Sequence, residues 1–189
     1  MAMQHTPLLM SKIIDRGAKV APNEEIVTAT ENGVRRQTYK ETRDRAHQLA
    51  HALADAGIAV GDRVGTFMWN GSRHLEAYQA CAGMGAVLHT LNIRLSEKDL
   101  EYIINHAEDQ IIIVDADILP LLEKLEGKMP TVRQVVIATE EGFEGWSTQL
   151  PNAVDYEDFI KDKPTHYEWP DIDENSPLGL CYTLSLIHI

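Results

Sequence analysis

The sequence predicts an α/β protein with a doubly wound, mainly parallel β-sheet, flanking helices and an N-terminal β-hairpin. Short apolar runs suited to strands alternate with amphipathic helical segments between residues 63 and 138, and the connections are short. Two of the runs, at residues 111–114 and 135–138, are uninterrupted, which is typical of strands that are covered on both faces. Repeated strand–helix–strand units of this kind wind into a parallel sheet through right-handed crossovers.

A helix and a hairpin are expected before this alternation. Apolar residues at helical spacing predict the helix over residues 8–18. Residues 26–30 predict a strand, Asn32-Gly33 is typical of a tight turn, and residues 34–38 can return antiparallel to the strand. A β-hairpin therefore follows the first helix.

The remaining elements follow in order along the chain. Thr38 and Glu41 match a capping box at the start of a helix that ends at Gly57. The predicted strands of the alternating part cover residues 63–68, 86–89, 111–114 and 135–138, and its helices cover residues 72–82, 96–107 and 118–125. Residues 140–176 are acidic and contain several prolines, so we expect a surface excursion there, after which residues 178–182 resume as a strand.

Composition and charge indicate a globular protein and disfavour nucleic-acid binding. With 189 residues, 44% of them hydrophobic, the chain can bury one sizeable core. The net charge is −12, and residues 140–175 hold eleven Asp or Glu against two Lys. Such an acidic surface repels phosphate backbones and anionic lipid, which disfavours nucleic-acid binding, although one local basic patch can remain hidden in the fold.

The sequence also predicts a cellular compartment. No apolar run reaches the ~18 residues of a membrane span, and the first residues lack the pattern of a secretion signal. Cys81 and Cys181 lie a hundred residues apart, so neither a disulfide framework nor a zinc knuckle is suggested. We therefore expect a cytoplasmic protein without a transmembrane span.

Two local patterns resemble ligand sites, but a structural interpretation is favoured for both. His47 and His51 lie one helical turn apart, a spacing that can hold a metal ion, yet no Glu stands beside them as in a His-Glu-x-x-His motif. We interpret them as part of a solvated helix face. Gly83-Met84-Gly85 resembles the start of a dinucleotide-binding loop but follows a helix and precedes a strand, so we expect close helix-to-strand packing instead.

Candidate ligand-binding residues come from the position of the strands. In an open parallel sheet, ligands gather beyond the carboxyl ends of the strands. The predicted strands place Trp69 and Asn70, His89 and Thr90, and Asp115 at that edge. For each of them, capping a turn or filling a loop is the favoured interpretation, and no nucleophile with its base, no carboxylate pair and no phosphate cradle follows from spacing alone.

Four blocks of sequence resemble a known family. They are Gly-Asp-Arg-Val at 61–64, Trp-Asn-Gly-Ser-Arg-His-Leu-Glu-Ala-Tyr at 69–78, Gly-Ala-Val-Leu-His-Thr-Leu-Asn-Ile-Arg-Leu at 85–95 and Tyr-Ile-Ile-Asn-His-Ala-Glu-Asp at 102–109. Together these blocks are similar to the N-terminal region of AMP-forming fatty acyl-CoA synthetases, in the adenylate-forming superfamily. Methylmercaptopropionate-CoA ligases share the blocks, and the similarity runs from about Pro7 to Thr183.

The resemblance implies an activity and its cofactors. Relatives of this kind activate a fatty or related carboxylic acid with ATP to an acyl-adenylate and pyrophosphate, with Mg²⁺, and then transfer the acyl group to coenzyme A. It implies that the phosphate-binding loop starts at Tyr182-Thr183, that Thr183 reaches the phosphates or Mg²⁺, and that Tyr182 positions the loop entry. Asn70, His89 and Thr90 are candidates for the crevice. A homodimer of the intact enzyme is also implied.

After Thr183 the chain departs from the family pattern. Where a Gly- and Thr-rich loop is expected, it continues Leu-Ser-Leu-Ile-His-Ile. We therefore expect a partial N-terminal AMP-binding domain over residues 1–183, without catalytic residues and inactive alone. Residues 184–189 are interpreted as a non-native tail, because they match one translation of a transposon-based sequencing adapter; a genuine apolar terminus is the alternative.

Two other functions stay open at this point. One alternative is a small, non-catalytic α/β module that binds a nucleotide or a protein. The other is a regulatory chain that pairs with a full-length enzyme.

Overall fold

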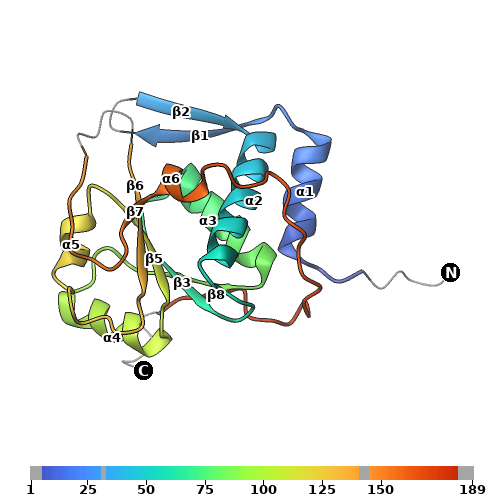
Figure 1. Cartoon of the computed structure of the whole chain (residues 1–189). Coiled ribbons are helices and arrows are strands. Elements are labelled where there is room, and N and C mark those ends of the chain that lie inside the picture. Colours follow the sequence, from blue (N-terminus) through green and yellow to red (C-terminus); the bar gives the residue numbers. More distant parts are fainter. Residues whose placement is uncertain (1–5, 31–32, 141–144, 183–189) are drawn as a thin grey trace, which may run out of the picture.

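The computed structural model describes residues 6–30, 33–140 and 145–182, and its centre is a six-stranded parallel sheet (Figure 1). The spatial order of the strands is β7-β6-β5-β3-β4-β8, and every neighbouring pair is parallel. In that order the strands are β7 (Val154–Asp155), β6 (Gln134–Ala138), β5 (Ile111–Asp115), β3 (Arg63–Phe67), β4 (Val87–Thr90) and β8 (Gly179–Leu180). The predicted parallel sheet is confirmed.

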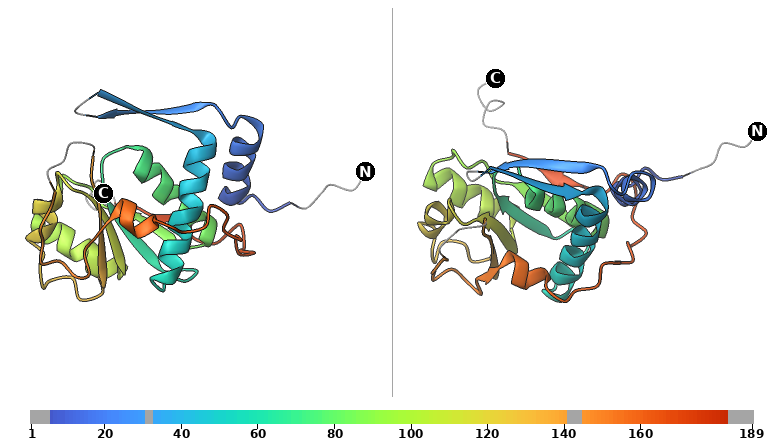
Figure 2. Two further views of the ribbon diagram at one scale, coloured as in Figure 1. Left: turned by 45° about the horizontal axis from the view of Figure 1, so that its top comes forward. Right: turned by 90° about the horizontal axis from the view of Figure 1, so that it is seen from above.

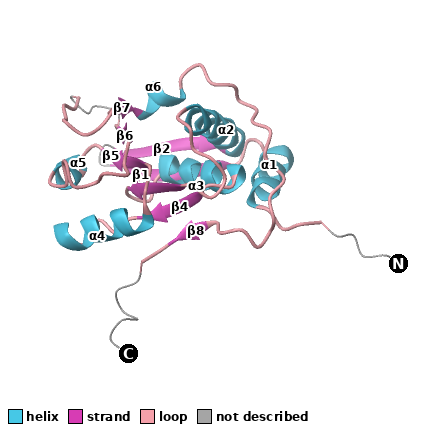
Figure 3. Cartoon of the chain, turned by 60° about the horizontal axis from the view of Figure 1, so that its bottom comes forward, coloured by secondary structure: helices cyan, strands magenta, loops and turns pink. Residues whose placement is uncertain are grey.

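Helices cover both faces of the sheet, as a doubly wound fold requires (Figure 3). One face carries α2 (Tyr39–Asp55), α3 (Ser72–Met84) and α6 (Tyr156–Ile160), with α1 (Met10–Val20) packed on α2 and α3. The other face carries α4 (Glu97–Ala107) and α5 (Leu119–Glu123). Within the described residues, none of these helices has the length and apolar character needed to cross a bilayer.

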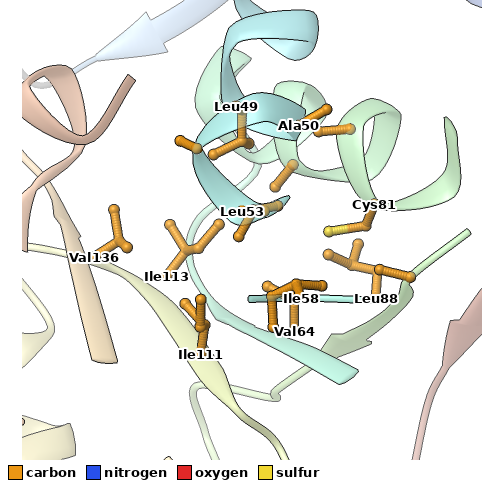
Figure 4. Packing of buried hydrophobic residues seen from close by; sticks show 14 of the residues in the cluster. Leu49, Ala50, Leu53, Ile58, Val64, Cys81, Leu88, Ile111, Ile113 and Val136 are labelled. Atoms are coloured by element: carbon orange, nitrogen blue, oxygen red, sulfur yellow. The ribbon is translucent and has the colours of Figure 1, made fainter. Parts of the chain in front are cut away.

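The uninterrupted apolar strands divide their side chains between two cores. Ile111 and Ile113 of β5 face Leu49 and Leu53 of α2 (Figure 4), whereas Ile112 and Val114 belong to the core under α4 and α5. Because successive side chains of a strand point to opposite faces, a strand covered on both faces must be apolar throughout. This is the physical reason why the runs predicted the central strands correctly.

The hairpin forms a separate two-stranded sheet from β1 (Glu25–Thr30) and β2 (Gly33–Thr38), paired antiparallel from Thr30 with Gly33. Gly33 has φ +135°, a value that favours glycine, while Asn32 lies outside the described residues. The predicted capping box is present, since Thr38 accepts from the backbone N–H of Glu41 and the Glu41 carboxylate accepts from that of Thr38. These backbone and side-chain bonds lower the pKa of Glu41.

The prediction of a surface excursion over residues 140–176 is wrong in part. Its middle adds β7 to the sheet edge and then forms α6, where Tyr156 is fully buried. Further on, Trp169 packs so closely on α3 that a Cβ atom at Gly83 would lie 2.6 Å from its ring. The described acidic residues of this segment are exposed or half-buried, while a few aromatic and apolar residues anchor it to the body.

The interpretation of His47 as a solvated residue is also wrong, because the same segment covers it. His47 is 1% exposed, and its Nδ1 accepts a 2.7 Å hydrogen bond from the backbone N–H of Tyr167. Its Nε2 lies 3.1 Å from a carboxylate oxygen of Asp15 on α1, and its ring packs on Trp169. His51 is half-buried and bonds the carbonyl of His166. Both histidines therefore fasten the segment to the helices.

Candidate functional site

Trp69 and Asp115 meet at the carboxyl edge of the sheet, where β3 and β5 end. The backbone N–H of Trp69 donates a 2.7 Å hydrogen bond to Asp115, and its indole N–H donates to Asp117 at 2.8 Å. Burial raises the pKa of Asp115 to about 6; the Trp69 bond opposes this shift, and the charges of Asp117 and Glu140 add to it. Asp115 therefore releases its proton at a higher pH than an ordinary aspartic acid.

The other residues predicted for the crevice lie in different environments. Asn70 is exposed beside Trp69, and Thr90 is half-buried at the end of β4. His89 is fully buried, and it lies on the face of the sheet opposite the α2–α3 core, because its neighbour Leu88 faces that core and successive side chains alternate. The structure thus brings Trp69 and Asp115 together but leaves His89 inside the molecule.

His89 forms a buried pair with Asp109. The two side chains are both 0% exposed, and Nδ1 of His89 lies 2.8 Å from a carboxylate oxygen of Asp109. Gly65, which pairs with His89 across β3 and β4, leaves room for this carboxylate, since a Cβ there would approach it to 3.2 Å. Burial raises the pKa of Asp109, and the His89 bond opposes the shift. Sequence reasoning missed Asp109; the available signal was an acid two residues before a fully apolar strand.

Tyr182 packs against this pair at the end of β8. Its ring centroid lies 5.1 Å from that of His89, and its hydroxyl lies 2.6 Å from Nδ1 of His106 on α4. β8 runs parallel to β4, with Leu180 opposite His89, so Tyr182 leaves the sheet at the same carboxyl edge as Trp69 and Asp115. Thr183, the other residue predicted for the phosphate loop, lies outside the described residues.

An arginine cluster under the hairpin was not predicted. It surrounds a cavity of about 250 Å³, lined among others by Arg35, Arg45, Ser72 and Arg73. Carboxylates already pair with these guanidinium groups: Glu157 binds Arg45 through two bonds of 2.8 and 2.9 Å, and Arg73 and Arg35 both contact Glu140. The cluster is therefore a salt-bridge network that joins the hairpin, α2, α3 and α6. Residues this far apart in sequence give no local signal.

Among the residues that the structure describes, no group of three or more His, Cys, Asp or Glu side chains is placed to hold a metal ion. The carboxyl edge instead carries Trp69 and Asp115 after β3 and β5, in the same sheet as β8, which leads to the predicted phosphate loop. Comparison with protein families then matches residues 14–183 to the AMP-binding enzyme family.

The chain belongs to the AMP-binding enzyme family. It is 37% identical to a medium-chain-fatty-acid–CoA ligase of Ectopseudomonas oleovorans over 96% of this chain and 33% of the relative. It is 38% identical to a 3-methylmercaptopropionyl-CoA ligase of Ruegeria pomeroyi (96% and 34%) and to a long-chain-fatty-acid–CoA ligase of Thermus thermophilus (96% and 32%). This AMP-binding enzyme chain thus spans about a third of the length of the curated relatives it matches.

A solved structure has the same fold as this AMP-binding enzyme chain. The anthranilate CoA ligase AuaEII, in complex with anthranoyl-AMP, superposes with a TM-score of 0.78 at 22% identity, over 94% of this chain and 31% of that one. The resemblance inferred from the four sequence blocks is confirmed, and the alternative of a non-catalytic binding module is not favoured.

Proposed function

We propose that the chain forms the N-terminal part of an ATP-dependent acid–CoA ligase. The intact protein would activate a fatty or related carboxylic acid with ATP to an acyl-adenylate, release pyrophosphate, and pass the acyl group to the thiol of coenzyme A. The family match over residues 14–183, with acid–CoA ligases as relatives, is the observation that supports this function. The chain alone is expected to be inactive.

The geometry of β8 supports a role for Tyr182 and Thr183 at the phosphates. Tyr182 is held between His89 and His106, and the chain leaves β8 at the carboxyl edge, where open parallel sheets bind ligands. A loop that begins there can present backbone N–H groups and the Thr183 hydroxyl to phosphate oxygens. Asn70 and Thr90 would then line the adjoining crevice, and His89 would act from beneath, through Tyr182.

Mg²⁺ would serve to offset the negative charge of the ATP phosphates. The described residues provide no cluster of three ligand side chains, so they do not form a complete metal site by themselves. Mg²⁺ commonly keeps several waters and binds through substrate phosphates and a few protein oxygens. We therefore assign this chain one candidate ligand, the Thr183 hydroxyl. A cytoplasmic location and a homodimer of the intact enzyme belong to the same proposal.

The test is to extend the gene from its source DNA beyond Thr183 and assay the protein for acid-dependent ATP–pyrophosphate exchange. Exchange that requires both a carboxylic acid and Mg²⁺ is expected, and a panel of acids of different chain length would define the substrate. Thr183→Ala should reduce exchange strongly, whereas Thr165→Ala, at an exposed position in the acidic segment, should not. No exchange with any acid, or a stop codon directly after Ile189, would contradict the ligase.

A further inference from the structure

The exposed side of α1 carries two parallel stripes of side chains. Positions four and seven residues apart lie on one side of a helix. One stripe is basic and consists of Lys12, Arg16 and Lys19, all of them exposed. The adjacent stripe is apolar and consists of Ile13, Gly17 and Val20. The opposite side of the helix, with Ser11, Ile14 and Ala18, is buried against the body.

The apolar stripe continues into a groove at the start of α1. Ile13 is 54% exposed and Val20 66%, and Leu8, which precedes the helix, is 77% exposed. The groove encloses about 500 Å³ and is lined by these residues together with Pro7, Leu9 and the basic Lys12 and Arg16. α1 lies at the outer edge of the molecule in two perpendicular views (Figures 1 and 2). An unusually apolar surface is therefore open to solvent there.

The charge of this surface is opposite to that of the chain, which has a net charge of −12. Within the described ranges, Lys12, Arg16 and Lys19 form no salt bridge; Lys12 donates to the carbonyl of Pro7. Asp15 is the one acid of the helix, and its carboxylate instead contacts His47 and accepts a hydrogen bond from the indole N–H of Trp169. Glu174 touches the end of the patch, where it accepts a hydrogen bond from the backbone N–H of Leu8. The patch thus keeps its positive charge.

We propose that α1 docks the protein on the surface of an anionic lipid bilayer. A helix that places apolar side chains next to a row of Lys and Arg lies in the membrane interface, with the apolar groups among the acyl chains and the basic groups at the lipid phosphates. Because salt screens charges beyond about 10 Å at 0.1 M, distant acidic residues do not cancel this local attraction. The acidic composition, which suggested repulsion from anionic lipid, does not describe this patch.

A second copy of the chain fits the patch less well. In a two-fold symmetric dimer the same patch meets itself, so the row formed by Lys12, Arg16 and Lys19 would face or border an identical basic row. Like charges in an interface oppose association, whereas anionic lipid complements them. The inference does not depend on ligase activity, since binding is measured on the 189-residue chain itself.

The test is co-sedimentation of the chain with vesicles of phosphatidylcholine alone and of phosphatidylcholine with about 30% phosphatidylserine. We expect binding to the anionic vesicles that weakens as salt rises. The triple change Lys12→Gln, Arg16→Gln, Lys19→Gln should lower the partition coefficient about 100-fold. The matched control, Lys98→Gln, Lys124→Gln, Lys161→Gln, removes the same charge from exposed positions on other elements and should bind like the unchanged chain.

A second variant tests the apolar stripe. Ile13→Ser with Val20→Ser removes two exposed side chains and should also reduce binding, while thermal unfolding stays close to that of the unchanged chain. Equal binding to neutral and anionic vesicles, or equal losses in the triple variant and its control, would overturn the proposal. So would a dimer in sedimentation velocity that the triple variant dissociates, combined with no vesicle binding, because the patch would then be an interface between copies.

Discussion

Two carboxylates, Glu76 and Asp109, are completely buried on opposite faces of the same sheet, and their surroundings differ. Glu76 on α3 accepts hydrogen bonds from Arg45, Gln37 and the hydroxyl of Tyr156, at 2.8, 2.8 and 2.7 Å. Asp109 has a single side-chain partner, His89, and its other carboxylate oxygen has none among the described residues.

The difference shows two uses of a buried acid. Glu76 is compensated by a guanidinium and two neutral donors, so it links α2, α3, the hairpin and α6 into one unit. Asp109 is less compensated, which raises its pKa through burial, and it lies under the histidine that packs on Tyr182. The first group stabilises the scaffold, and the second supports the strand that leads to the predicted phosphate loop.

The largest effect is expected from Glu76→Ala. Removing this carboxylate takes one partner from the half-buried Arg45 and leaves the Tyr156 hydroxyl without its acceptor, while Gln37 keeps only its bond to Thr42. We expect a loss of about 3 kcal/mol in the free energy of unfolding, measured by urea denaturation. Glu126→Ala, at an exposed position, should change it by less than about 0.5 kcal/mol. Similar values for both variants would mean that the network contributes little.

Asp109→Ala should lower the free energy of unfolding by less, about 2 kcal/mol, because it leaves one buried donor of His89 unsatisfied. A double-mutant cycle with Gly65→Ala isolates the packing. With Asp109 present, a Cβ at position 65 lies 3.2 Å from its carboxylate and 3.2 Å from Cγ1 of Ile112, and the Asp109→Ala background removes the first of these contacts only. Gly65→Ala should therefore be clearly destabilising alone and less so in the double variant. Simple additivity would contradict the close contact.

Asp115 adds a carboxylate at the open edge, and its titration gives a pH-dependent prediction. Its pKa is raised from 3.8 to about 6, so between these values the folded chain binds more protons than the unfolded chain. The contribution of Asp115 to stability therefore falls as the pH rises from 4 to 6. Asp115→Asn should remove this loss. Relative to the unchanged chain, its free energy of unfolding should be about 1 to 2 kcal/mol higher at pH 7 than at pH 4. A difference independent of pH would contradict the raised pKa.

The smallest effect is expected from Tyr182→Phe, which removes the hydrogen bond to His106 but keeps the ring on His89. Because Tyr182 is only half-buried, the free energy of unfolding should fall by about 0.5 kcal/mol. The ring resonances of His106 should shift in NMR spectra, while those of His89 stay in place. A large shift at His89 would show that the hydroxyl, and not the ring, determines the packing.

The sequence predicted most of the fold because local patterns determine it. The apolar runs of β5 and β6, the capping box at Thr38 and the glycine that begins β2 depend on neighbouring residues alone. The contributions of Tyr156 and Trp169 could not be predicted, because their partners Glu76 and Gly83 are about 80 residues away in the chain. The acidic composition around them hid two aromatic anchors, the buried Tyr156 and the half-buried Trp169.

The candidate site was predicted in part for the same reason. The carboxyl-edge rule placed Trp69 and Asp115 together, and a 2.7 Å hydrogen bond joins them. It did not show that His89 is buried, because the burial of a residue at a strand end depends on the strand's register within the sheet, which only the pairing with β3 reveals. Thr183 remains a prediction.

The order of the strands has a consequence for folding. β7 forms one edge of the sheet and β8 the other, although they follow one another in the chain, so the connecting segment crosses the whole molecule before β8 can pair with β4 (Figure 1). Contacts between residues so distant in sequence form slowly, because a long loop must close first. With two residues in β8 to hold it, this edge should assemble last.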